Sequence, residues 1–207
     1  QRNVIIGEKN TIINNTISSI ILGNDNSNNR IQNSVVYGTN IDISNCNNIL
    51  IGGNNNKSTT SNNNLIFGNN NDVSNNTTNS LITGLNIKSN KNNQVFVTGD
   101  TNTIENSLNS LIVGKELDIS NVKQNIIGGN NNKDHDGVNN LLSGSEHIVN
   151  TSNDMTILGN KNESTSGKYC LLTGINNDII TSHASFISGE NNKDQDGSNN
   201  IISGIGN

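Results

Sequence analysis

Proline and tryptophan are missing from this sequence, methionine occurs once, and only five of the 207 residues are aromatic. Hydrophobic residues make up 29% of the chain, too little for the broad core of an ordinary globular domain. No apolar run approaches the length that spans a membrane, and no signal peptide is present. The net charge is −5 with both signs scattered, so no basic stripe marks a nucleic-acid surface. We therefore expect no nucleic-acid partner and no membrane contact within this segment.

Asparagine, in contrast, supplies roughly a quarter of the chain, a composition that by itself is typical of disorder or of β-aggregation. A strict repeat argues against disorder. The six residues NSLITG at 79–84 return in variant form about every fifteen residues, and their last position is always glycine. These anchor glycines are Gly7, Gly23, Gly38, Gly53, Gly68, Gly84, Gly99, Gly114, Gly129, Gly144, Gly159, Gly174, Gly189 and Gly204.

The residues just before each anchor glycine predict a β-strand with two apolar faces. Two positions before the glycine every residue is aliphatic, and most are β-branched, as Ile82 and Val97 are. Three positions before it the residue is again apolar, except at Thr156. Adjacent strand residues point to opposite faces, so one row faces the inside of the coil and the other must be covered from outside. We expect further copies of this chain to cover it, which predicts a homo-oligomer.

A second short strand is readable after each glycine. Asparagine often follows three positions on, as at Asn56 and Asn162, and stacked amides there are expected to hydrogen-bond from coil to coil. An apolar residue often returns five positions on, as at Ile43 and Ile104, and belongs to the facing wall. The glycine itself fits a turn position with positive φ. The sequence predicts one all-β domain over 1–207, a parallel β-solenoid of about fourteen coils of about fifteen residues.

The NSLITG repeat at 79–84, with NSVVYG at 33–38, NSLIVG at 109–114 and the variant NNLLSG at 139–144, resembles the NSxxxG signature of YadA-like head repeats. Those repeats belong to trimeric autotransporter adhesins. The resemblance covers nearly the whole chain. It implies a left-handed β-roll in which three chains wind about one axis, display on a bacterial surface, and attachment to host matrix or host cells.

Two near-identical segments are the sharpest local feature: NNKDHDG at 131–137 and NNKDQDG at 191–197. Each begins like a calcium-binding loop, but the twelfth position, where an EF-hand has glutamate, is Ser143 or Ser203. The EF-hand interpretation therefore fails. A weak surface calcium site and a solvated turn remain as alternatives. The candidate ligands are Asn132, Asp134, Asp136, Asn192, Asp194 and Asp196.

The remaining reactive residues predict no catalysis. Cys46 and Cys170 lie eight coils apart, too far for an intrachain disulfide, and are interpreted as lone buried thiols, with an interchain bond as the alternative. His135, His147 and His183 lack metal-ligand spacing and are expected at the surface or in turns. No nucleophile motif or phosphate-binding loop is present, so we expect neither an enzyme nor a cofactor. Ice binding through aligned threonines and a β-helical carbohydrate-active enzyme are weaker alternatives.

These observations predict an extracellular fibrous protein that mediates adhesion and acts as a rigid spacer at the cell surface, anchored in an outer membrane. The alternative is a phage or virus fibre segment, or a self-assembling extracellular filament. The chain begins and ends in mid-pattern, so we expect it to be part of a longer fibrous protein whose export signal and anchor lie elsewhere. Its partners are expected to be copies of itself, most simply a trimer, and host matrix or cell-surface ligands.

Overall fold

The structure is a computed structural model that describes residues 2–207, and these residues fold as a parallel β-solenoid with about fifteen residues per coil. The chain divides into two compact units, Gln1–Asn106 and Ser107–Asn207. Gln1 itself lies outside the described residues. A long and a short strand alternate throughout both units, so the predicted fold class is confirmed. The single domain expected over 1–207 stays a prediction.

The first unit contains fourteen strands. Its long strands are β1 (Val4–Ile6), β3 (Ile20–Asn24), β5 (Val35–Thr39), β7 (Leu50–Asn54), β9 (Leu65–Asn69), β11 (Leu81–Leu85) and β13 (Phe96–Asp100). Its short strands are β2 (Thr11–Ile13), β4 (Ser27–Asn29), β6 (Asp42–Ser44), β8 (Lys57–Thr59), β10 (Asp72–Ser74), β12 (Lys88–Asn90) and β14 (Thr103–Glu105).

The second unit repeats this order. Its long strands are β15 (Leu111–Lys115), β17 (Ile126–Asn130), β19 (Leu141–Ser145), β21 (Thr156–Asn160), β23 (Leu171–Ile175), β25 (Phe186–Glu190) and β27 (Ile201–Ile205). Its short strands are β16 (Asp118–Ser120), β18 (Lys133–His135), β20 (Ile148–Asn150), β22 (Glu163–Thr165), β24 (Asp178–Ile180) and β26 (Lys193–Gln195).

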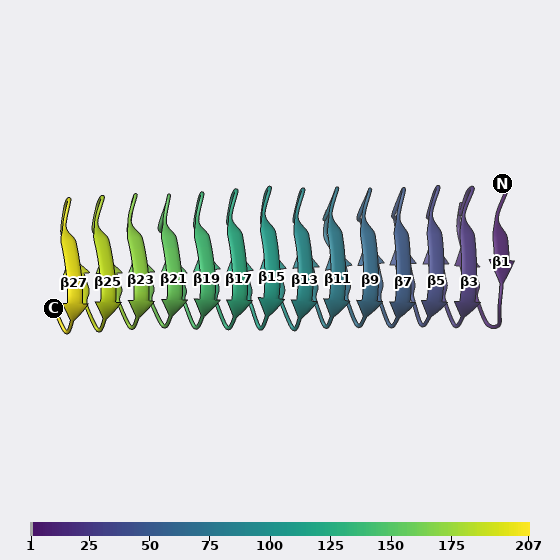
Figure 1. Cartoon of the computed structure of the whole chain (residues 1–207). Coiled ribbons are helices and arrows are strands. Elements are labelled where there is room, and N and C mark those ends of the chain that lie inside the picture. Colours follow the sequence, from purple (N-terminus) through teal and green to yellow (C-terminus); the bar gives the residue numbers. More distant parts are fainter. Residues whose placement is uncertain (1) are drawn as a thin grey trace. The chain divides into compact units, whose positions relative to one another are not determined.

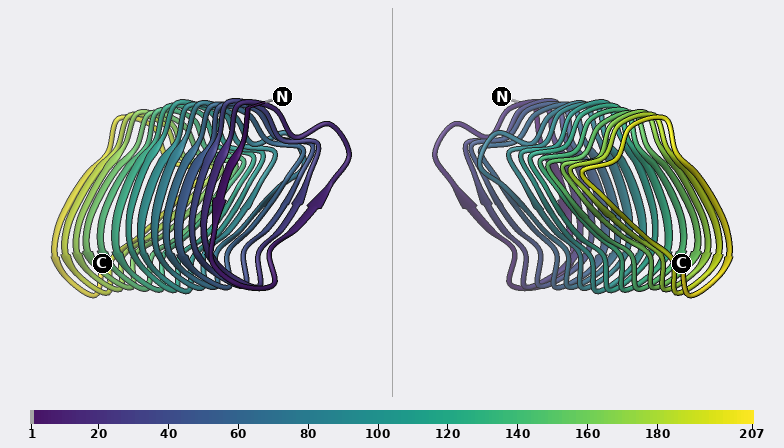
Figure 2. Two further views of the ribbon diagram at one scale, coloured as in Figure 1. Left: turned by 90° about the vertical axis from the view of Figure 1, so that its right-hand side faces the viewer. Right: turned by 90° about the vertical axis from the view of Figure 1, so that its left-hand side faces the viewer.

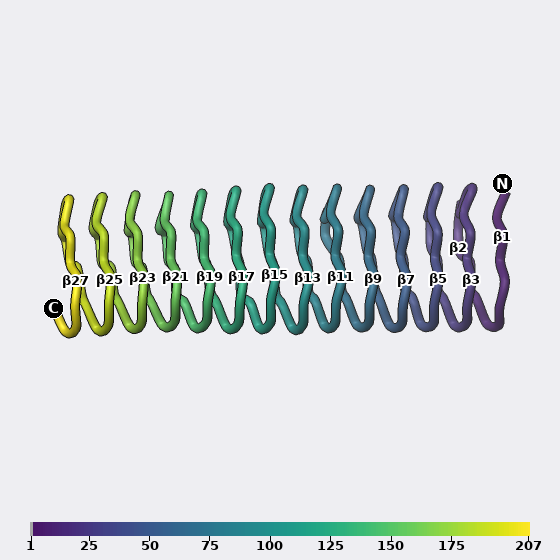
Figure 3. The backbone as a smooth tube through the Cα atoms, viewed as in Figure 1, coloured from purple at the N-terminus to yellow at the C-terminus, as the bar shows by residue number. Residues whose placement is uncertain are grey.

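Within each unit the long strands form one parallel wall (Figure 1), and the short strands form another. Each strand pairs with the strand one coil away in the register set by the anchor glycines, so that Gly68 lies beside Gly84 and Leu65 beside Leu81. A third side of the coil is closed by single parallel bridges, such as Asn47 to Asn62. Seen along the stack, the coils of each unit are flattened loops of similar outline (Figure 2), and each coil leads directly into the next (Figure 3).

The corners of the coil explain the high asparagine content. Three corner positions per coil have φ near +55°, for example Asn40, Asn45 and Asn48. Asparagine tolerates this left-handed conformation better than most residues, because its short polar side chain bonds locally. The corner amides also bond to one another between coils, as when Asn48 donates to Asn63 at 3.0 Å. Asparagine is therefore used for backbone conformation as well as for hydrogen bonding.

Two coils have sixteen residues instead of fifteen, and both place the extra residue at the same corner. Asn14 and Asn15 have φ of 47° and 43°, and Asn75 and Asn76 have φ of 50° and 68°. At this corner the fifteen-residue coils have a single left-handed residue, such as Asn45. A second left-handed asparagine thus absorbs the insertion, and the strands on either side keep their register.

The anchor glycines have φ between 110° and 154°. At Gly38 a Cβ atom would overlap the carbonyl oxygen of Gly53 in the next coil, and the same overlap recurs along the row. The predicted need for positive φ is confirmed, and a second reason for glycine is added: adjacent coils approach too closely for any side chain.

Each coil directs five positions inward, which together form a narrow core. In the coil around Gly129 these positions are Ile127, Asn132, Asp134, Gly137 and Asn140, all of them buried. The first position is aliphatic in every coil, and it is at most 1% exposed from β3 to β13 and from β15 to β25. The other four positions mix aliphatic with polar side chains. The interior is therefore held together by hydrogen bonds as much as by apolar packing.

Candidate functional site

The first residue of each long strand faces outward and remains uncovered. We call this row the outer seam. Leu65 is 44% exposed in the first unit and Ile126 is 51% exposed in the second, whereas the neighbouring Ile66 and Ile127 are buried. The described residues include no helix or additional sheet layer that could cover this row. The outer seam consists of Val4, Ile20, Val35, Leu50, Leu65, Leu81 and Phe96 in the first unit, and Leu111, Ile126, Leu141, Thr156, Leu171, Phe186 and Ile201 in the second.

The outward face of the short strands has the opposite character. In the first unit its first row runs Asp42, Lys57, Asp72 and Lys88, and these residues are direct register partners. In the second unit Lys193 Nζ lies 3.7 Å from Asp178 Oδ2. Opposite charges on neighbouring parallel strands favour the native register, although each exposed pair contributes only about 0 to 1 kcal/mol. The long strands therefore present an apolar row outward, and the short strands present a row rich in charged residues.

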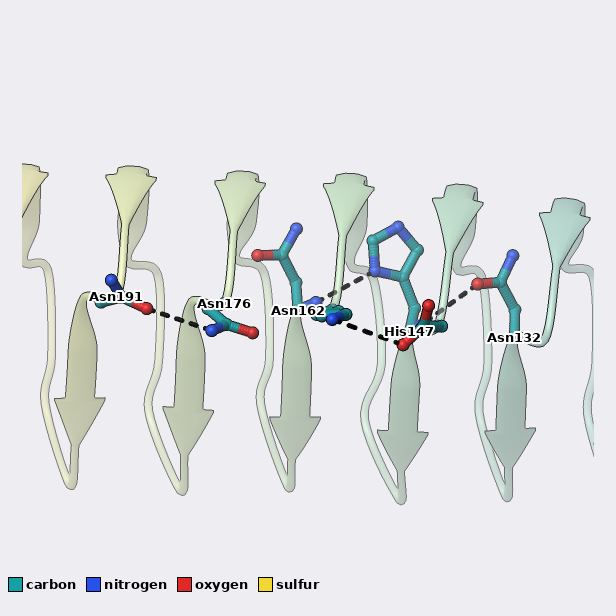
Figure 4. Close-up of polar contacts among 7 residues, drawn as sticks. Asn132, His147, Asn162, Asn176 and Asn191 are labelled. Carbon is teal, nitrogen blue, oxygen red and sulfur yellow. Dashed lines mark hydrogen bonds and ion pairs between the residues drawn. The ribbon is translucent and has the colours of Figure 1, made fainter.

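The asparagine row three positions after the anchor glycine is buried and links successive coils. The Nδ2 group of Asn162 donates to the carbonyl oxygens of Leu158 in its own coil, at 2.9 Å, and of Gly174 in the next coil, at 3.1 Å. Its Oδ1 accepts the backbone N–H of Asn177 at 2.9 Å. The predicted ladder is thus present, with mostly backbone groups as partners. Amide-to-amide bonds occur mainly at the corners, for example from Asn176 to Asn191 at 3.1 Å (Figure 4).

His147 occupies one position of this buried asparagine row (Figure 4). Its Nδ1 accepts the backbone N–H of Asn162 at 3.3 Å, and its Nε2 lies 3.2 Å from the carbonyl oxygen of Ser143. A neutral ring protonated on Nε2 satisfies both contacts, as an asparagine amide would. Burial lowers the pKa of His147, which agrees with a neutral ring. The expected surface or turn location is wrong for His147, which the register places inside the coil, while His183 is exposed.

The six candidate calcium ligands lie in three different surroundings. Asn132 and Asn192 belong to the buried asparagine row. Asp136 and Asp196 lie at exposed corners, with φ of 58° and 54°. The carboxylates of Asp134 and Asp194 lie inside the coil, at 0% and 3% exposure. Asp136 and Asp196 therefore lie in exposed turns, whereas Asp134 and Asp194 are not solvated, because they occupy an inward position of the short strand.

Asp134 has an unusual environment for an aspartate. Its Oδ2 accepts the amide of Asn125 at 2.6 Å, and the amide of Asn140 lies 3.5 Å from the same oxygen. Its Oδ1 is buried without a hydrogen-bond partner in the described part of the chain. Burial raises the pKa of Asp134 to about 7, although hydrogen bonds from the two amides oppose the shift. The carboxyl group therefore exchanges its proton near neutral pH.

The glycine three positions after each buried aspartate makes room for the carboxylate. A Cβ atom at Gly137 would overlap Oδ1 of Asp134, and one at Gly197 would overlap Oδ1 of Asp194. Both glycines occupy inward positions where most other coils have a larger side chain, such as Ile31, Cys46 or Ser61. The repeated D-x-D-G pattern thus reflects packing: aspartate and glycine share the space of two side chains inside one coil.

The cysteines are unpaired and buried, as predicted, and burial raises the pKa of both thiols.

Among residues 2–207 no three His, Cys, Asp or Glu side chains gather closely enough to hold a metal ion. No helix in that same range is long and apolar enough to cross a membrane.

No family model and no curated protein matches the sequence. Among solved structures, the chain is weakly similar to the polySia specific acetyltransferase NeuO, at 11% identity and a TM-score of 0.14, over 100% of this chain and 82% of that chain. It is also weakly similar to UDP-N-acetylglucosamine O-acyltransferase (LpxA) from Moraxella catarrhalis RH4, at 12% identity and a TM-score of 0.17, over 87% of this chain and 67% of that chain. Both scores are too low to support an argument about activity.

Proposed function

We propose that this chain is a self-associating fibrous module that acts as a rigid spacer and adhesive surface outside the cell. The observation that carries the proposal is the outer seam, an apolar row on the outside of each unit with no covering layer within the described chain. Water-exposed aliphatic residues in one continuous row are unfavourable, and burial against another copy removes them from water.

The length of the outer seam agrees with this role. In each unit it crosses seven long strands at about 4.8 Å spacing, so it is about 30 Å long. The same row on another copy could cover it along its whole length. The charged face of the short strands is suited to remain in water. Copies that meet at the outer seam would therefore form a closed assembly with the charged faces outside.

The number of copies in this proposal is three. The NSxxxG resemblance supports that number, and a cyclic arrangement allows every copy to bury its seam around a common axis. The corner asparagines and the buried asparagine row support the spacer role, because they bond each coil to the next at regular positions. Catalysis is not part of the proposal. Besides the cysteines, the buried groups with shifted pKa values are Asp134 and His147, and both are enclosed in contacts that hold the coils together.

Sedimentation equilibrium over a range of concentrations tests this proposal. The unmodified chain is expected to sediment with the mass of three chains. Replacing both Leu50 and Leu65 by lysine should release folded single chains, because charges on the seam oppose burial while the interior is unchanged. Lys57→Gln on the charged face is the matched control and should remain trimeric. A stable single-chain particle for the unmodified protein would overturn the proposal.

A further inference from the structure

A groove runs beside the apolar row of the first unit, with the anchor glycines as its floor. A hollow of about 360 Å³ is lined by Gly23, Tyr37, Gly38, Thr39, Gly53 and Asn54. The floor cannot be filled by side chains, because a Cβ on Gly23 or Gly38 would overlap the carbonyl oxygen of the next coil. The groove is therefore a fixed consequence of the coil spacing.

The two sides of the groove differ in chemistry. On one side stands the ring of Tyr37, which is 64% exposed, and beyond the hollow in the same row lies Phe67, two coils on and 38% exposed. Gly52 lies between them, and a Cβ there would be 3.7 Å from a ring carbon of Tyr37 and 3.1 Å from one of Phe67. Both rings therefore extend over Gly52 and form an aromatic strip about 10 Å long. The other side carries hydroxyl and amide groups, from Thr39 and Asn54.

We propose that this groove binds a neutral linear polysaccharide. The C–H faces of sugar rings pack on aromatic rings, whose faces carry partial negative charge, and Tyr37 and Phe67 offer two such surfaces along one line. Hydroxyl groups of the sugar would bond to Thr39 and Asn54, side chains that both donate and accept. The coil spacing of about 4.8 Å is close to the length of one sugar in an extended chain. The hollow lies within the size range of small-molecule sites.

Charge and backbone hydrogen bonding favour a neutral polysaccharide over an anionic polysaccharide and over an extended peptide. The rows that flank the glycines of the first unit contain no lysine or arginine, so the groove offers no positive charge to an anionic polysaccharide. An extended peptide binds well where it can add to a sheet edge. Here the backbone groups of β5 are already paired with β3 and β7 on its two sides, so the groove offers a peptide only side chains.

A neutral polysaccharide in this groove would be a ligand for the adhesive part of the proposed function, and its binding does not depend on self-association. Isothermal titration calorimetry with cellohexaose and chitohexaose tests it, with a hexamer of galacturonic acid as the anionic comparison. At least one neutral hexamer is expected to bind and the anionic one to bind at least tenfold more weakly. Tyr37→Ala should weaken binding at least tenfold, and Tyr37→Phe should change it less than threefold. Tyr169→Ala is the matched control, because Tyr169 is 61% exposed at a corner of the second unit.

The inference would be overturned by no binding of either neutral hexamer at millimolar concentration, by equal binding by Tyr37→Ala, or by preference for the anionic hexamer. Circular dichroism should confirm that each variant is folded, and sedimentation should report its chain number. If Tyr37→Ala lost both sugar binding and association, the ring would belong to the contact between copies, and the groove assignment would be wrong. If Tyr37→Ala loses sugar binding at an unchanged chain number, the groove is supported. If the unmodified oligomer binds no sugar, the groove is wrong and the proposed self-association is unaffected.

Discussion

Asn125 donates its side-chain amide to Asp134 at 2.6 Å, although the two residues lie nine positions apart and belong to successive coils. The second copy of the motif has serine in the equivalent place: Ser185 lies nine positions before Asp194. Ser185 Oγ and Asp194 Oδ2 are both buried without a hydrogen-bond partner among the described residues. Serine is too short to make the bond that asparagine makes. The two otherwise similar motifs therefore differ in how their buried carboxylates are satisfied.

The raised pKa of Asp134 predicts that stability falls as pH rises. In the unfolded chain the group has a pKa of 3.8, and in the folded chain about 7, so the folded state binds the proton more tightly. The stabilisation is complete below pH 4 and is lost as pH rises to 7, on the order of 4 kcal/mol in total. Asp134→Asn should remove this dependence and stabilise the protein at pH 8. Urea unfolding at pH 5 and pH 8 measures it, and Asp136→Asn, at an exposed corner, should leave the dependence in place.

Gly137→Ala should destabilise the protein by more than about 2 kcal/mol, because the added methyl group overlaps the carboxylate of Asp134. If shared space is the cause, the double variant Asp134→Ser/Gly137→Ala should recover most of the loss. Ser58 with Ser61 shows that serine at the position of Asp134 leaves room for a side chain at the position of Gly137 in another coil. A double-mutant cycle based on thermal unfolding gives the coupling energy, and additive effects would show that the two positions are independent.

The coil itself was predictable from the sequence because its main constraints recur in every repeat. The anchor glycine, the inward aliphatic position and the outer seam each follow from hard sterics or from strand alternation, as Gly84, Ile82 and Leu81 illustrate. Single residues that depart from the repeat pattern were harder to predict. For Asp134 the sequence left a surface calcium site and a solvated turn as alternatives, and both place the carboxylate at the surface, since buried aspartates are rare.

The register nevertheless contained the signal for these exceptions. Asp134 lies five positions after its anchor glycine, as the buried Val149 does in the next coil, and His147 lies three positions after its glycine, where asparagine usually stands. Position within the repeat was a better guide than residue type. The groove beside Tyr37 could not be predicted, because it depends on how the rings of Tyr37 and Phe67 lean over Gly52, which repeat position does not determine.

His147 predicts the opposite pH response from Asp134. Its folded pKa is lowered by burial, so the unfolded chain binds the proton more tightly, and stability is lost as pH falls below the ordinary histidine value of 6.5. Protonation of Nδ1 would also place a donor against the N–H of Asn162. His147→Asn should restore the row and abolish this acid sensitivity, with a gain of about 1 kcal/mol at pH 5. Chemical denaturation at several pH values compares His147→Asn with His183→Asn, the exposed-site control. If both variants changed the pH dependence of the unfolding free energy equally, the contact between His147 Nδ1 and the N–H of Asn162 would be contradicted.

Gly128 and Gly129 are adjacent in β17 and should respond very differently to alanine. Gly129 has φ of 111°, and a Cβ there would overlap the carbonyl oxygen of Gly144. The nearest atom to a Cβ on Gly128 is the carbonyl oxygen of Val113, at 3.7 Å, which is ordinary contact. Gly129→Ala should therefore cost more than about 3 kcal/mol or prevent folding, since coil spacing and conformation both fail. Gly128→Ala should change stability by less than about 1 kcal/mol, because it only restricts the unfolded chain. Thermal unfolding of the two variants decides the point: similar losses would mean that strand flexibility, rather than contact between coils, selects glycine in this row.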